Sequence, residues 1–168
     1  MTLKAASCPT NSPSAHRPIS VRTATSDITG EDYLGLLNFA RRTQSLIGLV
    51  WREQLKFSPT ALQVAVDLEP SLVEERLTEE WPGTRLFGGQ AWYRLYRCDE
   101  HSIPVLARVG RLFGWRAPDY PEDLSFHLPT GELWLTTITH ESQGRIDIAT
   151  VGEAAAHELV RLAGLSND

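Results

Sequence analysis

The residues best suited to acid–base chemistry lie at the ends of two predicted strands in the second half of the chain. His140 and Glu141 end the longer strand, and Asp123 begins the shorter one. A histidine or a carboxylate can act as a general acid or base. Adjacent strand residues point to opposite faces, so each would need a cross-strand neighbour as its partner. The alternative is structural, with a hydrogen-bonded histidine and with Asp123 paired to an arginine.

A second candidate is a run of aromatic and basic residues in a strand predicted near the middle of the chain. Trp92, Arg94 and Tyr96 share one face of it, where they could stack on nucleic-acid bases or hold a flat ligand. With Trp115 and Trp134, Trp92 could also line a pocket around the acid–base residues. Aromatic residues in strands are more often packing residues, so a face covered by a helix is the alternative.

The third candidate is an acidic cluster, which favours protein binding. Residues 71–80 predict a short helix with apolar residues on one side and four glutamates on the other. An acidic face attracts basic partners, although many charged helix faces are only solvated. Trp and Tyr side chains near a following loop would supply the strongest contacts. The predicted interface comprises Glu74, Glu75, Glu79, Glu80, Trp81, Trp115, Tyr120 and Glu122.

Signatures of metal and cofactor binding are missing from the sequence. Cys98 and His101 have a Cys-x-x-His spacing, but no second ligand pair follows at a recognisable distance. There is no Gly-x-Ser-x-Gly elbow, no Walker-type loop and no Gly-x-Gly-x-x-Gly after a strand. The run Phe87-Gly88-Gly89 reads only as a turn. We therefore expect neither a metal nor a cofactor.

Composition is typical of a cytoplasmic globular protein. Of the 168 residues, 42% are hydrophobic and 22% are charged, and the net charge of −5 makes nucleic acid an improbable partner. No apolar run approaches the roughly 18 residues that span a bilayer, so no membrane is expected. Cys8 and Cys98 lie in different contexts and predict no disulfide framework.

The elements that must position these residues alternate between helix and strand. Residues 1–27 are rich in Ser, Thr and Pro and predict a disordered tail before a single globular domain at 28–168. The predicted elements are a helix at 31–57 (with a strand at 45–51 as the alternative), a strand at 62–68, a helix at 71–80, a strand at 90–98, a helix from 99 or 102 to 114, a hairpin of strands at 123–128 and 132–141, and a helix at 151–165. The hairpin requires an antiparallel pair. We therefore expect an α+β fold with one mainly antiparallel sheet of about four strands and helices packed mostly on one face.

Three short motifs in the same region carry a family resemblance. They are Trp81-Pro82-Gly83-Thr84, then Pro121-Glu122-Asp123-Leu124 with Phe126, and then His140-Glu141. Together they resemble an uncharacterised family of small bacterial α+β proteins with a WPGT turn, a PEDL-x-F strand and a closing HE, some of which carry a sporulation-protein label. The similarity covers about residues 80–142. It implies a standalone bacterial domain and supplies no catalytic residue.

These observations favour a protein-binding module over an enzyme. An immunity or antitoxin-like protein, which sequesters a basic partner through an acidic and aromatic surface, fits the net charge and the missing catalytic signatures. Two alternatives stay open. One is a small enzyme that uses His140, Glu141 or Asp123 in a Trp-lined pocket. The other is a binder of a small ligand or nucleic acid that uses the face of Trp92, Arg94 and Tyr96.

Overall fold

The fold is built on one seven-stranded sheet, seen in a computed structural model that describes residues 21–24 and 26–164, without the side chain of Glu153. The strands run in the order β1-β9-β8-β7-β2-β6-β3, and every neighbouring pair is antiparallel. The strands of this sheet are β1 (Val21–Ala24), β2 (Leu46–Arg52), β3 (Leu72–Thr78), β6 (Ala91–Arg97), β7 (Glu122–His127), β8 (Leu133–Ile138) and β9 (Gln143–Asp147). A separate small hairpin is formed by β4 (Glu80–Trp81) and β5 (Thr84–Arg85), and the helices are α1 (Gly30–Arg42), α2 (Pro59–Leu68), α3 (Ser102–Val109), α4 (Ile148–Val151) and α5 (Glu153–Leu162).

The predicted α+β class with a mainly antiparallel sheet is confirmed, but the number of strands is not. The sheet has seven strands where about four were expected. Part of the difference is β1, which pairs with β9 along Val21–Ala24 and lies within the predicted tail. The structured part of the chain therefore begins before residue 28, and residues 1–20 of the tail prediction lie outside the described residues.

The two elements that follow β2 were predicted with the wrong type. Residues 62–68 form α2 instead of a strand, because Ser58 caps the helix, with its Oγ accepting a bond from the backbone of Ala61, and Pro59 opens the first turn. The buried side chains Ala61, Val64 and Leu68 follow helical spacing.

Residues 71–80, predicted as a helix, contain β3, and the short strand β4 begins at Glu80. β3 pairs with β6 along its length. Opposite charges meet across this pair where Arg94 Nε donates to Glu75 Oε2 at 3.0 Å. Helix propensity is only a weak prior, and pairing with a strand that is distant in sequence overrides it here.

The predicted helix at 31–57 is wrong in its second half, because α1 ends at Arg42 and residues 46–52 form the strand β2, which was the alternative for 45–51. Other expectations are confirmed. The central strand is β6, and the predicted hairpin is β7 and β8. The final helix is divided between α4 and α5 at Gly152, whose φ is +83°.

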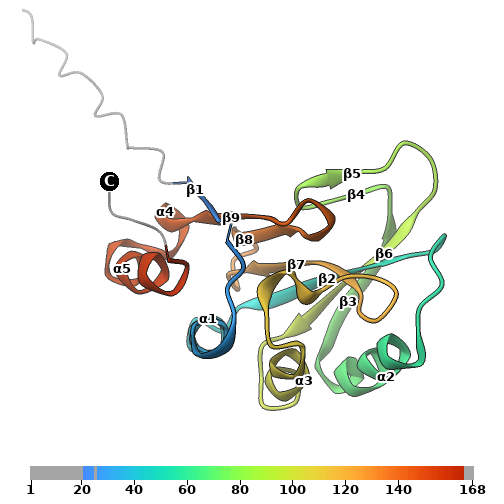
Figure 1. Ribbon diagram of the computed structural model, residues 1–168, viewed down its shortest axis with the longest axis horizontal. Coiled ribbons are helices and arrows are strands. Elements are labelled where there is room, and N and C mark those ends of the chain that lie inside the picture. The colour runs from blue at the N-terminus through green and yellow to red at the C-terminus, as the bar shows by residue number, and fades with distance from the viewer. Residues whose placement is uncertain (1–20, 25, 165–168) are drawn as a thin grey trace, which may run out of the picture.

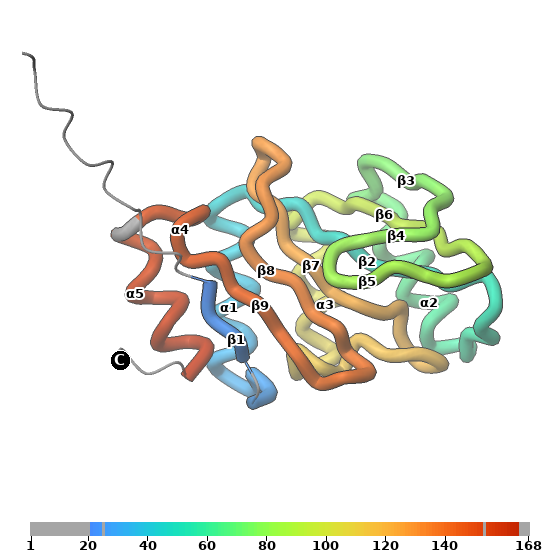
Figure 2. The backbone as a smooth tube through the Cα atoms, turned by 90° about the horizontal axis from the view of Figure 1, so that it is seen from above, coloured from blue at the N-terminus to red at the C-terminus, as the bar shows by residue number. Residues whose placement is uncertain are grey.

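The two faces of the sheet are covered differently. Helices α1, α2, α3 and α5 supply residues to one large core against the sheet, and Figure 1 shows α1, α2 and α3 together beneath it. On the opposite face the β4–β5 hairpin lies over the middle of the sheet, as Figure 2 shows from above. There Trp81 packs with Val50, Ala91 and Tyr93 in a second, small apolar cluster.

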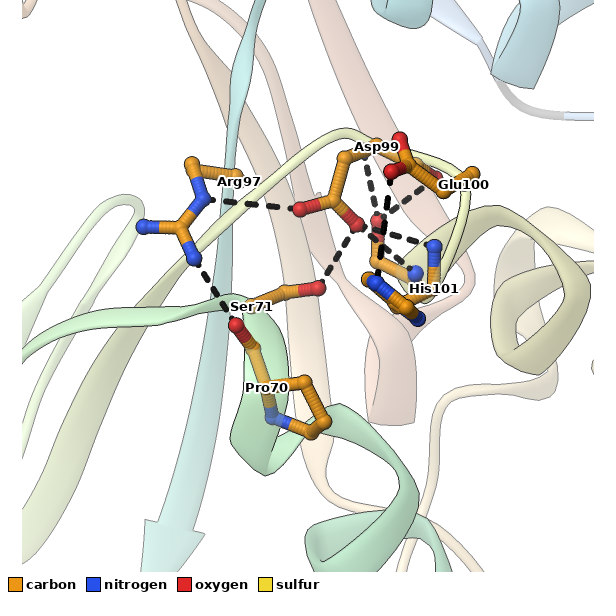
Figure 3. A network of polar contacts seen from close by, with 7 residues as sticks. Pro70, Ser71, Arg97, Asp99, Glu100 and His101 are labelled. Carbon is orange, nitrogen blue, oxygen red and sulfur yellow. Dashed lines mark hydrogen bonds and ion pairs between the residues drawn. The ribbon is translucent and has the colours of Figure 1, made fainter.

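A polar network fixes the junction between β3, β6 and α3 (Figure 3). Oδ1 of Asp99 accepts bonds from Ser71 Oγ at 2.7 Å and from the backbone amides of His101 at 3.0 Å and Ser102 at 3.1 Å. Arg97 Nε lies 3.4 Å from the other carboxylate oxygen. Asp99 therefore caps the start of α3 and ties it to the chain just before β3.

Candidate functional site

The predicted acid–base residues lie where β7 begins and just after β8 ends, because His140 and Glu141 belong to a short 3₁₀ turn at Thr139–Glu141 and not to the predicted strand. Asp123 is buried with a φ of +54°, a conformation uncommon for residues other than glycine. Its Oδ2 accepts from Trp81 Nε1 at 2.8 Å, and its Oδ1 accepts from the backbone amide of Thr139 at 2.9 Å. Asp123 is thus satisfied by an indole and an amide rather than by the expected arginine. Both oxygens are engaged in joining β4, β7 and the end of β8, so Asp123 serves the structure.

Glu122, next to Asp123 in the chain, is a second buried carboxyl of this region. Glu122 is 8% exposed, and its Oε2 lies 3.6 Å from Arg52 Nη1. Burial, and then the neighbouring Asp123, raise the pKa of Glu122, while Arg52 and His140 act in the opposite direction. His140 is exposed, with its Nε2 3.8 Å from Glu141 Oε1. Glu122 is thus paired with Arg52 and lies close enough to His140 to feel its charge, and Arg52 is a residue of this region that the sequence did not reveal.

The Trp-lined pocket expected around these groups is not formed. Trp115 and Trp134 are fully buried in the main core. Trp115 Nε1 donates to Tyr33 Oη at 3.0 Å, and Trp134 Nε1 donates to Ser45 Oγ at 2.9 Å. The cavity of about 200 Å³ beside Trp134 is walled by residues such as Arg145 and does not include Glu122 or His140. These indoles are therefore packing residues, and Trp115 is not available as a partner contact.

The side chains of Trp92, Arg94 and Tyr96 make their contacts within the protein itself. Tyr96 is buried in the main core, and Trp92 is half-buried. The guanidinium of Arg94 lies 5.4 Å from the centroid of the Trp51 ring and is also bonded to Glu75. The side chains that were expected to hold a base or a flat ligand are largely committed to the protein itself.

A polar cluster on the opposite face of β6 was not anticipated. Tyr93 Oη lies 2.8 Å from Ser125 Oγ and 2.7 Å from His127 Nε2. Burial lowers the pKa of His127 and raises the pKa of Tyr93 to about 12, so both are neutral at pH 7. The strand glycine Gly48 makes room for this cluster, because an added Cβ would lie 2.0 Å from Tyr93 Oη. A glycine inside an apolar strand is a recognised signal of such close approach.

The acidic residues remain on the surface, although on the strands β3 and β4 and the bend between them instead of on a helix. Glu74, Glu75, Glu79 and Glu80 are all exposed. Glu75 is bound to Arg94, and Arg85 Nε lies 4.0 Å from Glu80 Oε2.

The other residues of the predicted interface are less accessible than expected. Trp81, Trp115 and Glu122 are buried. Tyr120 is half-buried against Trp115, with ring centroids 5.8 Å apart. The aromatic part of the predicted interface is therefore mostly interior.

Phe87 takes the place of these aromatic residues on the surface. It follows β5 and is 99% exposed. The backbone amide of the preceding Leu86 donates to the carbonyl of Glu79 at 2.8 Å, which holds Phe87 close to the acidic residues. We call Glu79, Glu80, Arg85 and Phe87 the hairpin surface. The sequence contained Phe87, but only the tertiary structure leaves it uncovered.

The described residues hold no cluster of three or more His, Cys, Asp or Glu side chains that could bind a metal ion. Cys98, half of the Cys-x-x-His spacing, is buried, and burial raises the pKa of its thiol to about 12. Among residues 21–24 and 26–164, no helix combines the length and apolar character that crossing a bilayer requires. Comparisons with protein-family models, with curated proteins and with solved structures found no match for the chain.

Proposed function

We propose that the chain is a protein-binding module that sequesters a basic partner, in the manner of an immunity or antitoxin-like protein, and that the hairpin surface is its point of contact. The observation that carries the proposal is the side chain of Phe87, 99% exposed beside Glu79 and Glu80. A single large apolar side chain set among charges is the arrangement of an interface anchor with a polar rim.

The anchoring of the hairpin supports this proposal. Trp81 is buried and bonded to Asp123, which fixes one side of the hairpin on the sheet. At the turn, an added Cβ on Gly83 would lie 3.0 Å from Thr136 Cγ2, so the turn rests closely on β8. Phe87 is thus presented from a fixed base, which lowers the entropy cost of binding.

Electrostatics defines the partner. The chain has a net charge of −5, and Glu79 and Glu80 project from the hairpin near a single arginine, Arg85. A basic protein would be drawn to this surface, and its association would slow as salt screens the charges. Once the proteins are in contact, burial of the Phe87 ring would supply the apolar part of the binding energy.

The test is capture of a partner from a lysate of the protein's own host, with the full chain as bait. Wild type should retain one stoichiometric basic protein that is released by salt. Phe87→Ala and the double variant Glu79→Gln/Glu80→Gln should each lose most of it. Matched controls are Leu34→Ala, an exposed apolar residue on α1, and Glu31→Gln/Asp32→Asn at the start of the same helix. Equal retention by all variants, or no retained protein, would contradict the proposal.

A further inference from the structure

The strand β3 ends the sheet with one edge unpaired. Its only partner strand in the described part of the chain is β6, and Figure 2 shows β3 at the outer end of the sheet. The residues from Val73 to Leu77 are all exposed, and Val73 and Leu77 keep 50% and 41% of their surface in water. An edge that is seven residues long offers backbone donors and acceptors to another strand.

The side chains of β3 are complementary to a second copy of the same strand. Glu74 and Arg76 lie opposite Leu95 and Tyr93 of β6, so both project from the same face of the sheet. If two copies of β3 pair in antiparallel fashion about a twofold axis through Glu75, Glu74 of each copy faces Arg76 of the other. Two ion pairs form across the new interface, since both copies contribute each residue.

Neighbouring registers lack this complementarity. Two residues directly opposite each other in an antiparallel sheet point to the same side of the sheet. Because side chains alternate along β3, the twofold axis must pass through a residue and not between two residues. An axis through Arg76 would set two arginines against each other and Glu75 against Leu77. An axis through Glu74 would place the Glu74 side chains of the two copies against each other. With the axis at Glu75, the two Glu75 side chains meet, but each is already neutralised by its own Arg94 at 3.0 Å.

The helix next to this edge carries an apolar strip that the fold leaves uncovered. On α2, Leu62 is 57% exposed and Val66 is 65% exposed, one helical turn apart. Val66 also borders a shallow apolar cavity with Ala65 and Pro70, just before β3 begins. Figures 1 and 2 both place α2 at the same end of the molecule as β3. In a sheet joined through β3, both α2 helices lie on the same side, because an axis perpendicular to the sheet preserves its faces.

We propose that two copies of this chain associate through antiparallel pairing of β3 about Glu75, and that the exposed strips of α2 pack together beneath the joined sheets. The occupant of the edge is a second copy, since the charge pattern of β3 matches itself in one register. Charged residues on an edge strand usually prevent pairing with other chains. In β3 the same charges exclude the wrong registers and permit one. The paired residues run from Leu72 to Thr78 in this register and end one residue before Glu79, so the dimer would present one hairpin surface next to each end of the joined strands.

The test is sedimentation velocity of the full chain over a wide range of concentrations. Wild type should dimerise. Glu74→Arg and Arg76→Glu each replace two attractive pairs with repulsive ones and should weaken association about tenfold or more. The double variant Glu74→Arg/Arg76→Glu exchanges the charges and should restore the dimer. A wild type that stays monomeric, or a double variant no better than the single ones, would overturn the proposal.

A second arm of the test leaves β3 unchanged. Val66→Lys on α2 should weaken the dimer, whereas Leu34→Lys, which alters an exposed leucine of α1 that is 39% accessible, should not. An equal effect of both substitutions would argue against the predicted packing of α2. All of these variants retain Phe87, Glu79 and Glu80, so self-association and partner capture can succeed or fail separately.

Discussion

Trp81 Nε1 donates a hydrogen bond of 2.8 Å to Asp123 Oδ2 across 42 positions of the sequence. The bond joins the β4–β5 hairpin to the start of the strand β7, and it links an aromatic residue of one sequence motif to a carboxylate of another. It explains why two segments of the sequence that looked functional are mainly structural. The hairpin surface depends on this bond for its position.

We predict that Trp81→Phe destabilises the protein by about 1–3 kcal/mol, because it leaves a buried acceptor of Asp123 without its donor. The free energy of unfolding, measured by urea denaturation and followed by circular dichroism, checks this. The double variant Trp81→Phe/Asp123→Asn should cost less than the sum of the single changes, since the two groups interact directly. Strict additivity would show that the bond contributes nothing.

Asp99 gives a second stability prediction. Asp99→Ala removes the acceptor that caps α3 and binds Ser71 Oγ, and should cost about 0.5–2 kcal/mol. Asp99→Asn keeps an acceptor oxygen in the same place and should cost less. Thermal or urea unfolding of both variants distinguishes the two roles of the side chain. If Asn is as damaging as Ala, the carboxylate charge beside Arg97 matters more than the cap.

Gly48 should tolerate no side chain. In Gly48→Ala the new Cβ would lie 2.0 Å from Tyr93 Oη and 2.4 Å from Ser125 Oγ, so the hydrogen-bonded cluster must shift. We expect a loss of about 1–3 kcal/mol from overpacking, read as a lower unfolding midpoint in urea. Gly144→Ala is the matched control in β9, because the nearest atom to its Cβ is 3.5 Å away. Similar losses for both variants would contradict the role assigned to Gly48.

His127 predicts a pH dependence of stability. Its pKa is lowered from 6.5 in the folded protein, chiefly by burial, so below about pH 6.5 the unfolded chain binds more protons than the folded one. Its contribution to stability is therefore intact above that pH and is lost as the pH falls toward the folded pKa. Glu122, whose pKa is raised, acts in the opposite sense, because the folded state then binds the extra proton.

The measurement for this prediction is the free energy of unfolding from pH 7.5 down to pH 5. In His127→Gln the free energy of unfolding should fall less steeply as the pH is lowered. The substitution also removes the bond to Tyr93, so it should lower stability at every pH. His157→Gln, on the exposed side of α5, controls for the general loss of an imidazole. An unchanged slope in His127→Gln would assign the decline to other groups.

Local sequence patterns were sufficient to predict some of the strands. The strands β6, β7 and β8 were predictable, because alternating side chains and a turn containing Pro129 and Gly131 are local signals. The exchange of type between α2 and β3 was not predictable from periodicity. Leu62, Val64, Val66 and Leu68 alternate in sequence, yet the cap at Ser58 and the pairing partner of β3 decide the outcome.

The residues of the candidate site were also only partly predictable from the sequence. The sequence pointed correctly to the exposed glutamates of residues 74–80, because charged residues in numbers must face water. It could not show that Trp115 and Trp134 are core residues or that Phe87 is uncovered, since an aromatic side chain suits either environment. Nor could it pair Asp123 with Trp81, because that contact depends on where the hairpin folds back over the sheet.

By itself the sequence determined the class of the fold, the acidic surface and the lack of the common catalytic motifs, since these follow from composition and short-range spacing. The tertiary structure decided which strand ends the sheet, which face carries the hairpin, and which aromatic residue reaches the solvent. Those features depend on pairings between residues far apart in the chain, such as Glu75 with Arg94 and Trp81 with Asp123. Local propensities differ by about 1 kcal/mol or less, so long-range contacts of similar or greater strength override them.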